Sequence, residues 1–187
     1  ASAQAERAEE RAAEITDLIE KDLMLMGVTA VEDRLQDQVP EVIADFIQAN
    51  IKVWMLTGDK LETAENIGYS CKLIQSDFKK LYLESEKRLR DKLEEMTKIL
   101  ASREPTERFC LIAEGKAILR LSQDKELAQR FVEEVFSQCN SVVCCRMSPK
   151  QKGEVVRLIK NFMKKITLAI GDGANDCNMI QEAHIGI

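Results

Sequence analysis

The chain has 187 residues, of which 45% are hydrophobic and 32% are charged, and its formal net charge is −5. This composition is that of an ordinary globular protein with room for one domain and an appendage, and the acidic balance excludes a surface built to bind nucleic acid. No apolar run is long enough to cross a bilayer, and the charged, alanine-rich start of the chain is unlike a signal peptide.

The pattern of apolar residues predicts strands and helices in alternation. Residues 1–21 have the spacing of one charged helix, and Pro40 suits the first turn of another, because the N–H that proline lacks would be unpaired there. Along the rest of the chain we expect strands at 23–35 (with a loop), 51–56, 109–115, 141–145 and 166–170, and helices at 40–50, 61–73, 124–139, 148–165 and 175–183. Apolar strands separated by helices imply an α/β fold, in which helices flank a parallel sheet.

Residues 75–107 depart from this alternation. They are dense in Lys, Arg and Glu, with leucines spaced among the charges. We expect a solvated, helical insertion into the domain that ends near Pro105. A binding surface for a partner or regulator is the alternative.

Three of the predicted strands end in segments rich in polar residues and glycine: Thr57-Gly58-Asp59, Arg146 to Lys152, and Gly171 to Asp176. In an open parallel sheet, binding and catalytic groups gather beyond the carboxyl ends of the strands. Each segment alone could be an ordinary loop or helix cap, because Asp, Asn and Ser are favoured at such positions. Their occurrence at three strand ends indicates one shared site instead.

The residue types in these segments suit a magnesium–phosphate site. Thr57 offers a hydroxyl and Gly58 an open backbone N–H just before a helix, a combination that favours a phosphate. Lys152 lies in the first turns of its helix, where its ammonium can reach the same anion. The carboxylates of Asp172 and Asp176 are hard oxygen ligands of the kind that Mg²⁺ prefers.

The segments MLTGDKLETAENIG, RMSPKQKGEVV and GDGANDCNMIQEAHIGI resemble, in that order, the motifs of the haloacid-dehalogenase superfamily and of the phosphorylation domain of P-type ATPases. Together with IEKDLMLMGVTAVEDRLQDQVP they are most similar to the phospholipid-flippase class, over most of the chain outside 75–107. The resemblance implies a HAD-like Rossmannoid sheet and the cofactors Mg²⁺ and ATP. It also implies phosphoryl transfer from ATP to an aspartate, coupled to lipid movement across a membrane.

The same resemblance assigns roles to individual residues. The residues that it implies for catalysis at the phosphoryl group are Thr57, Gly58, Lys152 and Asn175. Asp59 and Arg146 would lie with them where the nucleotide approaches. The implied metal residues are Asp172, as a ligand of Mg²⁺, and Asp176, in support of that site.

The nucleophile of the family, the aspartate of a DKTGT motif, does not occur in this chain, and neither does the DxD nucleophile of the related phosphatases. The chain therefore resembles the second half of a phosphorylation domain, with 1–21 as the helix leading out of the nucleotide-domain insertion and 22–187 as the domain itself. We expect this fragment to be inactive alone and its sheet to be incomplete. Without the nucleophile strand, the strands that end at Leu56 and Ile170 are expected to pair with each other or to recruit a strand from a neighbouring chain.

In the parent protein the implied partners are the remaining nucleotide, actuator and membrane domains, a phospholipid substrate and, as an option, an auxiliary subunit. The chain would then lie in a cytosolic domain of an integral membrane protein of a eukaryotic cell. Two other functions stay open: a soluble HAD-type phosphohydrolase with an unidentified aspartyl nucleophile, and a non-catalytic, flippase-like regulatory domain in a larger protein. We expect the six cysteines to be reduced and mostly buried, and His184 to be a partly buried packing residue.

Overall fold

The computed structural model describes residues 11, 14–29, 35–84 and 88–187. The chain divides into two units, Ala1–Arg34 and Leu35–Ile187, and each is described by itself. In the first unit residues 14–19 are helical, and much of the predicted helix 1–21 lies outside the described residues. Residues 23–29 form no strand, and the side chains of Leu23 to Met26 are between 73% and 88% exposed. The prediction of a strand is therefore wrong for 23–29, where the backbone has no neighbouring strand to pair with.

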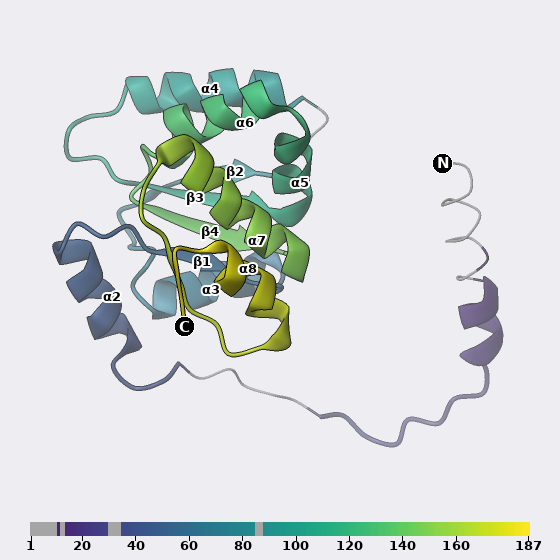
Figure 1. Cartoon of the computed structure of the whole chain (residues 1–187). Coiled ribbons are helices and arrows are strands. Elements are labelled where there is room, and N and C mark those ends of the chain that lie inside the picture. Colours follow the sequence, from purple (N-terminus) through teal and green to yellow (C-terminus); the bar gives the residue numbers. More distant parts are fainter. Residues whose placement is uncertain (1–10, 12–13, 30–34, 85–87) are drawn as a thin grey trace. The chain divides into compact units, whose positions relative to one another are not determined.

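The second unit is built on a sheet of four parallel strands in the order β1-β4-β3-β2 (Figure 1). The strands are β1 (Trp54–Leu56), β2 (Lys79–Leu83), β3 (Phe109–Glu114) and β4 (Ser141–Cys145). Every residue of β4 is buried, because β4 lies between β1 and β3 and helices cover both faces of the sheet. The predicted α/β fold with a parallel sheet is confirmed.

Alternate residues of the strands pack into two separate hydrophobic clusters. In β3, Leu111 and Ala113 join the larger cluster, whereas Cys110 and Ile112 join the smaller one on the other face. The larger cluster contains residues from α4 (Leu89–Ala101), α5 (Gly115–Gln123), α6 (Lys125–Phe131), the π-helix η1 (Val132–Phe136) and α7 (Pro149–Leu158). The smaller cluster contains residues from α3 (Leu61–Ser70) and, at its margin, α2 (Val39–Gln48).

Among residues 75–84 and 88–107, β2 and one face of α4 belong to this core, so the expectation of a solvated insertion is wrong. β2 pairs with β3 along its whole length, from Lys79 opposite Phe109 to Leu83 opposite Ala113. α4 is helical as expected, but it buries four side chains in the larger cluster: Leu89, Leu93, Met96 and Leu100. Their spacing places them on one stripe of the helix, while the abundant charges occupy the remaining faces.

The last predicted strand, 166–170, is mostly unpaired. Only β5 (Leu168–Ala169) forms, and it pairs with β6 (Ile185–Gly186) in a separate two-stranded ribbon. β1 and β5 do not hydrogen-bond, although the Leu56 side chain packs against the cluster that contains Ala169. The prediction that these two strands close on each other is therefore wrong, because β5 takes β6 as its partner. Recruitment of a strand from a neighbouring chain stays a prediction.

Two helical segments complete the second unit. α7 continues into the π-helix η2 (Ile159–Met163), and α8 (Cys177–Glu182) follows a short 3₁₀ turn, η3 (Ala174–Asp176). α8 packs on α7 in front of the sheet (Figure 1). Within the described part of the chain, no helix has both the length and the apolarity that a bilayer crossing requires.

Candidate functional site

The first predicted loop is a turn that starts at the end of β1. The backbone N–H of Thr57 donates to the carbonyl of Cys144 on β4 at 2.9 Å, which fixes the start of the turn. The hydroxyl of Thr57 donates to Asp59 Oδ2 at 2.5 Å and accepts from the backbone N–H of Asp59 at 3.1 Å. Gly58 is exposed, and a Cβ there would meet only the Met147 carbonyl at 3.6 Å, an ordinary van der Waals contact.

The second loop is hydrogen-bonded to the first through its backbone. The N–H of Arg146 donates to the carbonyl of Asp59 at 2.8 Å, and the N–H of Met147 donates to the carbonyl of Thr57 at 3.0 Å. Arg146 has a φ of 52°, which is uncommon for a residue other than glycine, and its Nε lies 3.4 Å from Glu114 Oε1. The exposed guanidinium of Arg146 is thus held at the carboxyl edge of the sheet, as the sequence predicted for this loop.

The start of α7 is fixed by a capping box. Ser148 accepts from the N–H of Gln151, and the Gln151 side chain accepts from the N–H of Ser148 at 2.8 Å. Gln151 also donates to the carbonyl of Gly115 at 2.9 Å, which joins α7 to the end of β3. We did not single out Gln151 from the sequence, although the Ser-x-x-Gln spacing is a recognisable signal of a capping box.

Lys152 joins α7 to the third loop. Its Nζ lies 2.7 Å from Asp176 Oδ1, and the two side chains are only 6% and 9% exposed. Few charges are buried to this degree unless they are paired, because each loses its hydration. Since α7 also follows the loop that is bonded to Thr57, all three predicted segments meet around the first turns of this helix.

The third loop presents one free and one paired carboxylate. Asp172 is exposed and has no hydrogen-bond or ion-pair partner among the described residues, whereas Asp176 is held by Lys152. The N–H of Gly171 donates to the carbonyl of Ile187 at 3.1 Å, and a Cβ on Gly171 would lie 2.7 Å from Asp176 Cγ. Glycine is therefore needed at 171 for the close approach of Asp176. Asn175 is exposed beside them.

These donors fit a magnesium ion that is shared with a phosphate. The described residues contain no cluster of three or more His, Cys, Asp or Glu side chains that could hold a metal without other ligands. Mg²⁺ in phosphoryl-transfer sites keeps several waters and takes only one or two protein carboxylates, with substrate oxygens as further ligands. Asp172 is available for such a role, and Asp176 becomes available if Lys152 turns to another anion.

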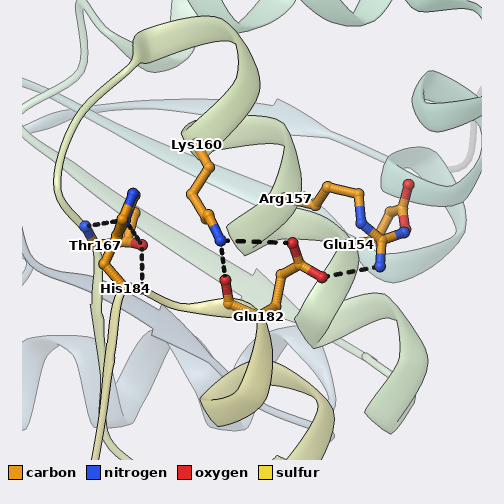
Figure 2. Close-up of polar contacts among 6 residues, drawn as sticks. All are labelled: Glu154, Arg157, Lys160, Thr167, Glu182 and His184. Carbon is orange, nitrogen blue, oxygen red and sulfur yellow. Dashed lines mark hydrogen bonds and ion pairs between the residues drawn. The ribbon is translucent and has the colours of Figure 1, made fainter.

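A second set of contacts joins α7 and η2 to the end of α8 (Figure 2). Arg157 lies 2.9 Å from both Glu154 and Glu182, and Lys160 Nζ donates to the Glu182 carbonyl at 2.5 Å. A pocket of 220 Å³ between these helices is lined by Lys150, Gly153, Glu154, Arg157, Asn178, Gln181 and Glu182. None of the predicted site residues lines this pocket.

The expectations for histidine and cysteine have different outcomes. His184 is exposed and hydrogen-bonds Thr167, so the expectation of a partly buried packing residue is wrong. Five of the six cysteines are buried free thiols, as expected, and Cys177 is exposed. Burial raises the pKa of Cys110 to about 11 and that of Cys139 to about 12, so both thiols stay protonated and unreactive at neutral pH.

Most of the chain is matched by the model of a known protein family. The model of the haloacid dehalogenase-like hydrolases matches residues 27–187, and the chain belongs to this family. It is similar to the probable phospholipid-transporting ATPase 4 of Arabidopsis thaliana, with 46% identity over 92% of this chain. It is also similar to the phospholipid-transporting ATPase DNF1 of Chaetomium thermophilum (42% over 97% of this chain) and to the phospholipid-transporting ATPase ID of Mus musculus (41% over 96%).

These similarities confirm the resemblance to the phospholipid-transporting ATPases that the motifs indicated. The matched part is a small share of each relative. The chain spans 15%, 13% and 17% of the lengths of the three relatives.

Proposed function

We propose that this chain supplies the magnesium–phosphate site of the phosphorylation domain in an ATP-driven, phospholipid-translocating P-type ATPase. The names of its relatives support the activity of the parent protein, since each is a phospholipid-transporting ATPase. Membership of the haloacid dehalogenase-like hydrolases supports phosphoryl chemistry at the carboxyl edge of the sheet.

One structural observation carries the proposal. The buried ion pair between Lys152 and Asp176 connects the third loop to α7, while backbone hydrogen bonds connect Thr57 to Met147 just before α7. A lysine and an aspartate from segments 24 residues apart are thus held together at the helix that follows the loop bonded to Thr57. Such a set of donors and a nearby free carboxylate, Asp172, is what a phosphoryl group with Mg²⁺ requires.

The residues would act on the phosphoryl group by positioning and by charge. Thr57 and Gly58 would donate to its oxygens, with Asn175 as a neutral amide donor, and Lys152 would exchange Asp176 for the phosphoryl anion. Asp172, with Asp176 in support, would hold Mg²⁺, which when bound offsets negative charge on the transferred group. The Thr57 hydroxyl, which donates to Asp59 in this structure, would turn to the incoming oxygen.

Asp59 and Arg146 would face the nucleotide. Their loops are joined by the hydrogen bond from the Arg146 N–H to the Asp59 carbonyl, so they would approach ATP together. Arg146 is exposed, and its one ionic contact among the described residues, at 3.4 Å to Glu114, leaves guanidinium N–H groups for a phosphate.

The nucleophilic aspartate would come from a part of the parent protein outside this chain. Its strand would fit between β1, which has a strand partner on one side only, and the β5–β6 ribbon. Ile166, Leu168 and Ile170 are 76%, 49% and 60% exposed along that ribbon, as expected for a surface that another segment covers. The fragment alone would then be inactive and would belong to a cytosolic domain of a eukaryotic membrane protein. Its partners would be the nucleotide, actuator and membrane domains and an optional auxiliary subunit.

The decisive experiment is the substitution Asp172→Asn in the intact parent protein. We expect it to abolish Mg²⁺-dependent turnover of the phosphoenzyme, because the amide lacks the charge that holds the metal. Asp77→Asn, which changes an exposed carboxylate outside the site, is the matched control and should retain normal turnover. Normal Mg²⁺-dependent hydrolysis by the Asp172→Asn protein would reject the assignment.

Two simpler measurements separate the alternative functions. Hydrolysis of a generic phosphate ester such as p-nitrophenyl phosphate by the purified chain would favour a soluble phosphohydrolase. Absence of a DKTGT motif from the parent sequence would favour the non-catalytic regulatory domain. The first alternative requires a nucleophile among these residues, and the second requires none anywhere in the protein.

A further inference from the structure

The loop that carries Asp172 is held by a very short strand pair. β5 and β6 are each two residues long, with Leu168 opposite Ile185 and Ala169 opposite Gly186. At the end next to the loop, the N–H of Ile187 donates to Ala169 at 2.9 Å and the N–H of Gly171 donates to Ile187 at 3.1 Å. A slip of one residue would move Asp172 by about 3.3 Å and turn the side chains of β5 to the opposite face.

Thr167 and His184 fasten the other end of the ribbon (Figure 2). The backbone N–H of His184 lies 3.1 Å from the Thr167 carbonyl and 3.2 Å from its hydroxyl oxygen. In return, the backbone N–H of Thr167 donates to His184 Nδ1 at 3.2 Å, and the hydroxyl oxygen lies 3.0 Å from the same nitrogen. We call these contacts the Thr167–His184 clamp.

The clamp requires an imidazole that is unprotonated at Nδ1. An amide N–H can donate to this nitrogen only while it carries a lone pair, and a protonated imidazole has N–H groups at both positions. The His184 ring is exposed, so it exchanges protons freely with water. A proton on Nδ1 therefore removes the acceptor of the Thr167 N–H.

Charged residues occur on the elements next to the clamp, and none of the described ones bonds to the ring. Lys160 of η2 and the end of α8 meet through the Glu182 carbonyl, and the Glu182 carboxylate lies 2.9 Å from Arg157. Lys164 and Lys165 come just before Thr167 in the sequence and are exposed. Among the described residues, only Thr167 hydrogen-bonds the imidazole of His184.

We propose that His184 is a positioning residue: through its unprotonated Nδ1 it holds Thr167, and thereby fixes the β5–β6 register that presents Asp172. Protonation of the ring removes the acceptor for the Thr167 N–H and loosens the ribbon up to Gly171. The significance of Asp172 as a metal ligand rests on the proposed function, whereas the clamp does not depend on it.

Amide hydrogen exchange of the ¹⁵N-labelled chain tests the clamp at pH 8 and pH 5, as protection factors corrected for intrinsic exchange. In the wild type we expect protection of Thr167 and Gly171 to fall about tenfold at pH 5, the size of effect that loss of one hydrogen bond produces. His184→Ala should show the low value at both pH values. His184→Asn, whose Oδ1 accepts at either pH, should keep the high value at both.

Val143 in the centre of β4 is the internal control, since its protection reports the whole fold and should be equal in all three proteins. Unchanged protection of Thr167 in His184→Ala would overturn the proposal. So would equal protection of wild-type Thr167 at both pH values, or a fall in His184→Asn as large as that in the wild type.

Addition of Mg²⁺ together with inorganic phosphate, the anion that the proposed site shares with the metal, separates the clamp from the metal site. We expect Mg²⁺ to change the exchange protection of the Asp172 amide in the wild type. In His184→Ala the same change should require an about tenfold higher Mg²⁺ concentration. If the Asp172 amide responds in none of the three proteins, the proposed metal site is contradicted. The exchange measurements made without magnesium still test the clamp. Identical Mg²⁺ responses in all three proteins would overturn the positioning role.

Discussion

The ammonium of Lys152 meets the carboxylate of Asp176 out of contact with water. Both charges lose hydration there, and their attraction compensates for that loss only while both partners are present. A single replacement leaves one uncompensated buried charge, which is among the most destabilising changes a core can receive. The pair therefore contributes to folding as well as to the proposed phosphate site.

We predict that Lys152→Met lowers the free energy of unfolding of this chain by about 3–5 kcal/mol. Lys150→Met, two residues earlier on the same helix but exposed, should change it by less than about 0.5 kcal/mol. The double substitution Lys152→Met with Asp176→Leu should recover most of the loss, because no buried charge remains. Urea unfolding followed by circular dichroism measures all three, and equal stabilities for the two single variants would contradict the prediction.

Burial on both faces makes a strand easy to predict. β4 has the bounds that the sequence predicted, 141–145, because a short apolar run between two turns is typical of a strand buried on both faces. The run 166–170 has the same apolar character, yet only Leu168 and Ala169 pair. The length of the strand that forms in this run depends on the strand beside it. The local pattern of apolar residues contains no information about that neighbouring strand.

The sequence proposed residues for the candidate site, but it did not predict the contacts that these residues make. Motif wording indicated Thr57, Lys152 and Asp176, whereas the hydrogen bond from Met147 to Thr57 follows from β1 and β4 being neighbours, which depends on strand order. The pairing of Lys152 with Asp176 likewise depends on how α7 and α8 pack. Contacts between segments distant in sequence are set by tertiary packing.

The amino-acid composition of residues 75–107 did not indicate that α4 packs in the core. The charges of residues 75–107 indicated a solvated segment, but the stripe of Leu89, Leu93, Met96 and Leu100 is buried against the sheet, and β2 forms its edge. The spacing of the apolar residues was a better guide than their proportion, because a helix needs only one apolar face to pack.

We predict that Leu93→Ala lowers the free energy of unfolding by about 2–5 kcal/mol, since this fully buried side chain would leave a cavity in the larger cluster. Ile99→Ala on the same helix, where the side chain is 37% exposed, should cost less than about 1.5 kcal/mol. Thermal unfolding of the two variants gives the comparison. Small and equal effects would mean that α4 is a solvated insertion after all.

The four-stranded sheet has an open edge at β1, and this edge faces the β5–β6 ribbon that holds the proposed metal loop. In a strand, the backbone N–H and C=O groups of successive residues point to opposite sides. The Thr57 N–H points to β4, so the backbone groups of Met55 also point to β4. The backbone groups of Trp54 and Leu56 therefore point away from β4. On the ribbon, Ala169 faces β6, so the backbone groups of Ile170 point to the other side. These outward groups are the donors and acceptors that a strand between β1 and β5 would use.

We predict that the amides of Leu56 and Ile170 exchange with solvent at least about tenfold faster than their neighbours Met55 and Ala169 in the monomeric chain, because the outward N–H groups lack a partner. In the intact parent protein all four amides should be protected, since the nucleophile strand would then pair with both edges. Each outward amide is compared with an inward amide one residue away, and Leu56 and Met55 are both half-buried. Protection of Leu56 and Ile170 that rises with chain concentration would instead show that a second copy fills the edge. Protection at every concentration would show that the chain closes it alone, and the nucleophile strand would then need another position.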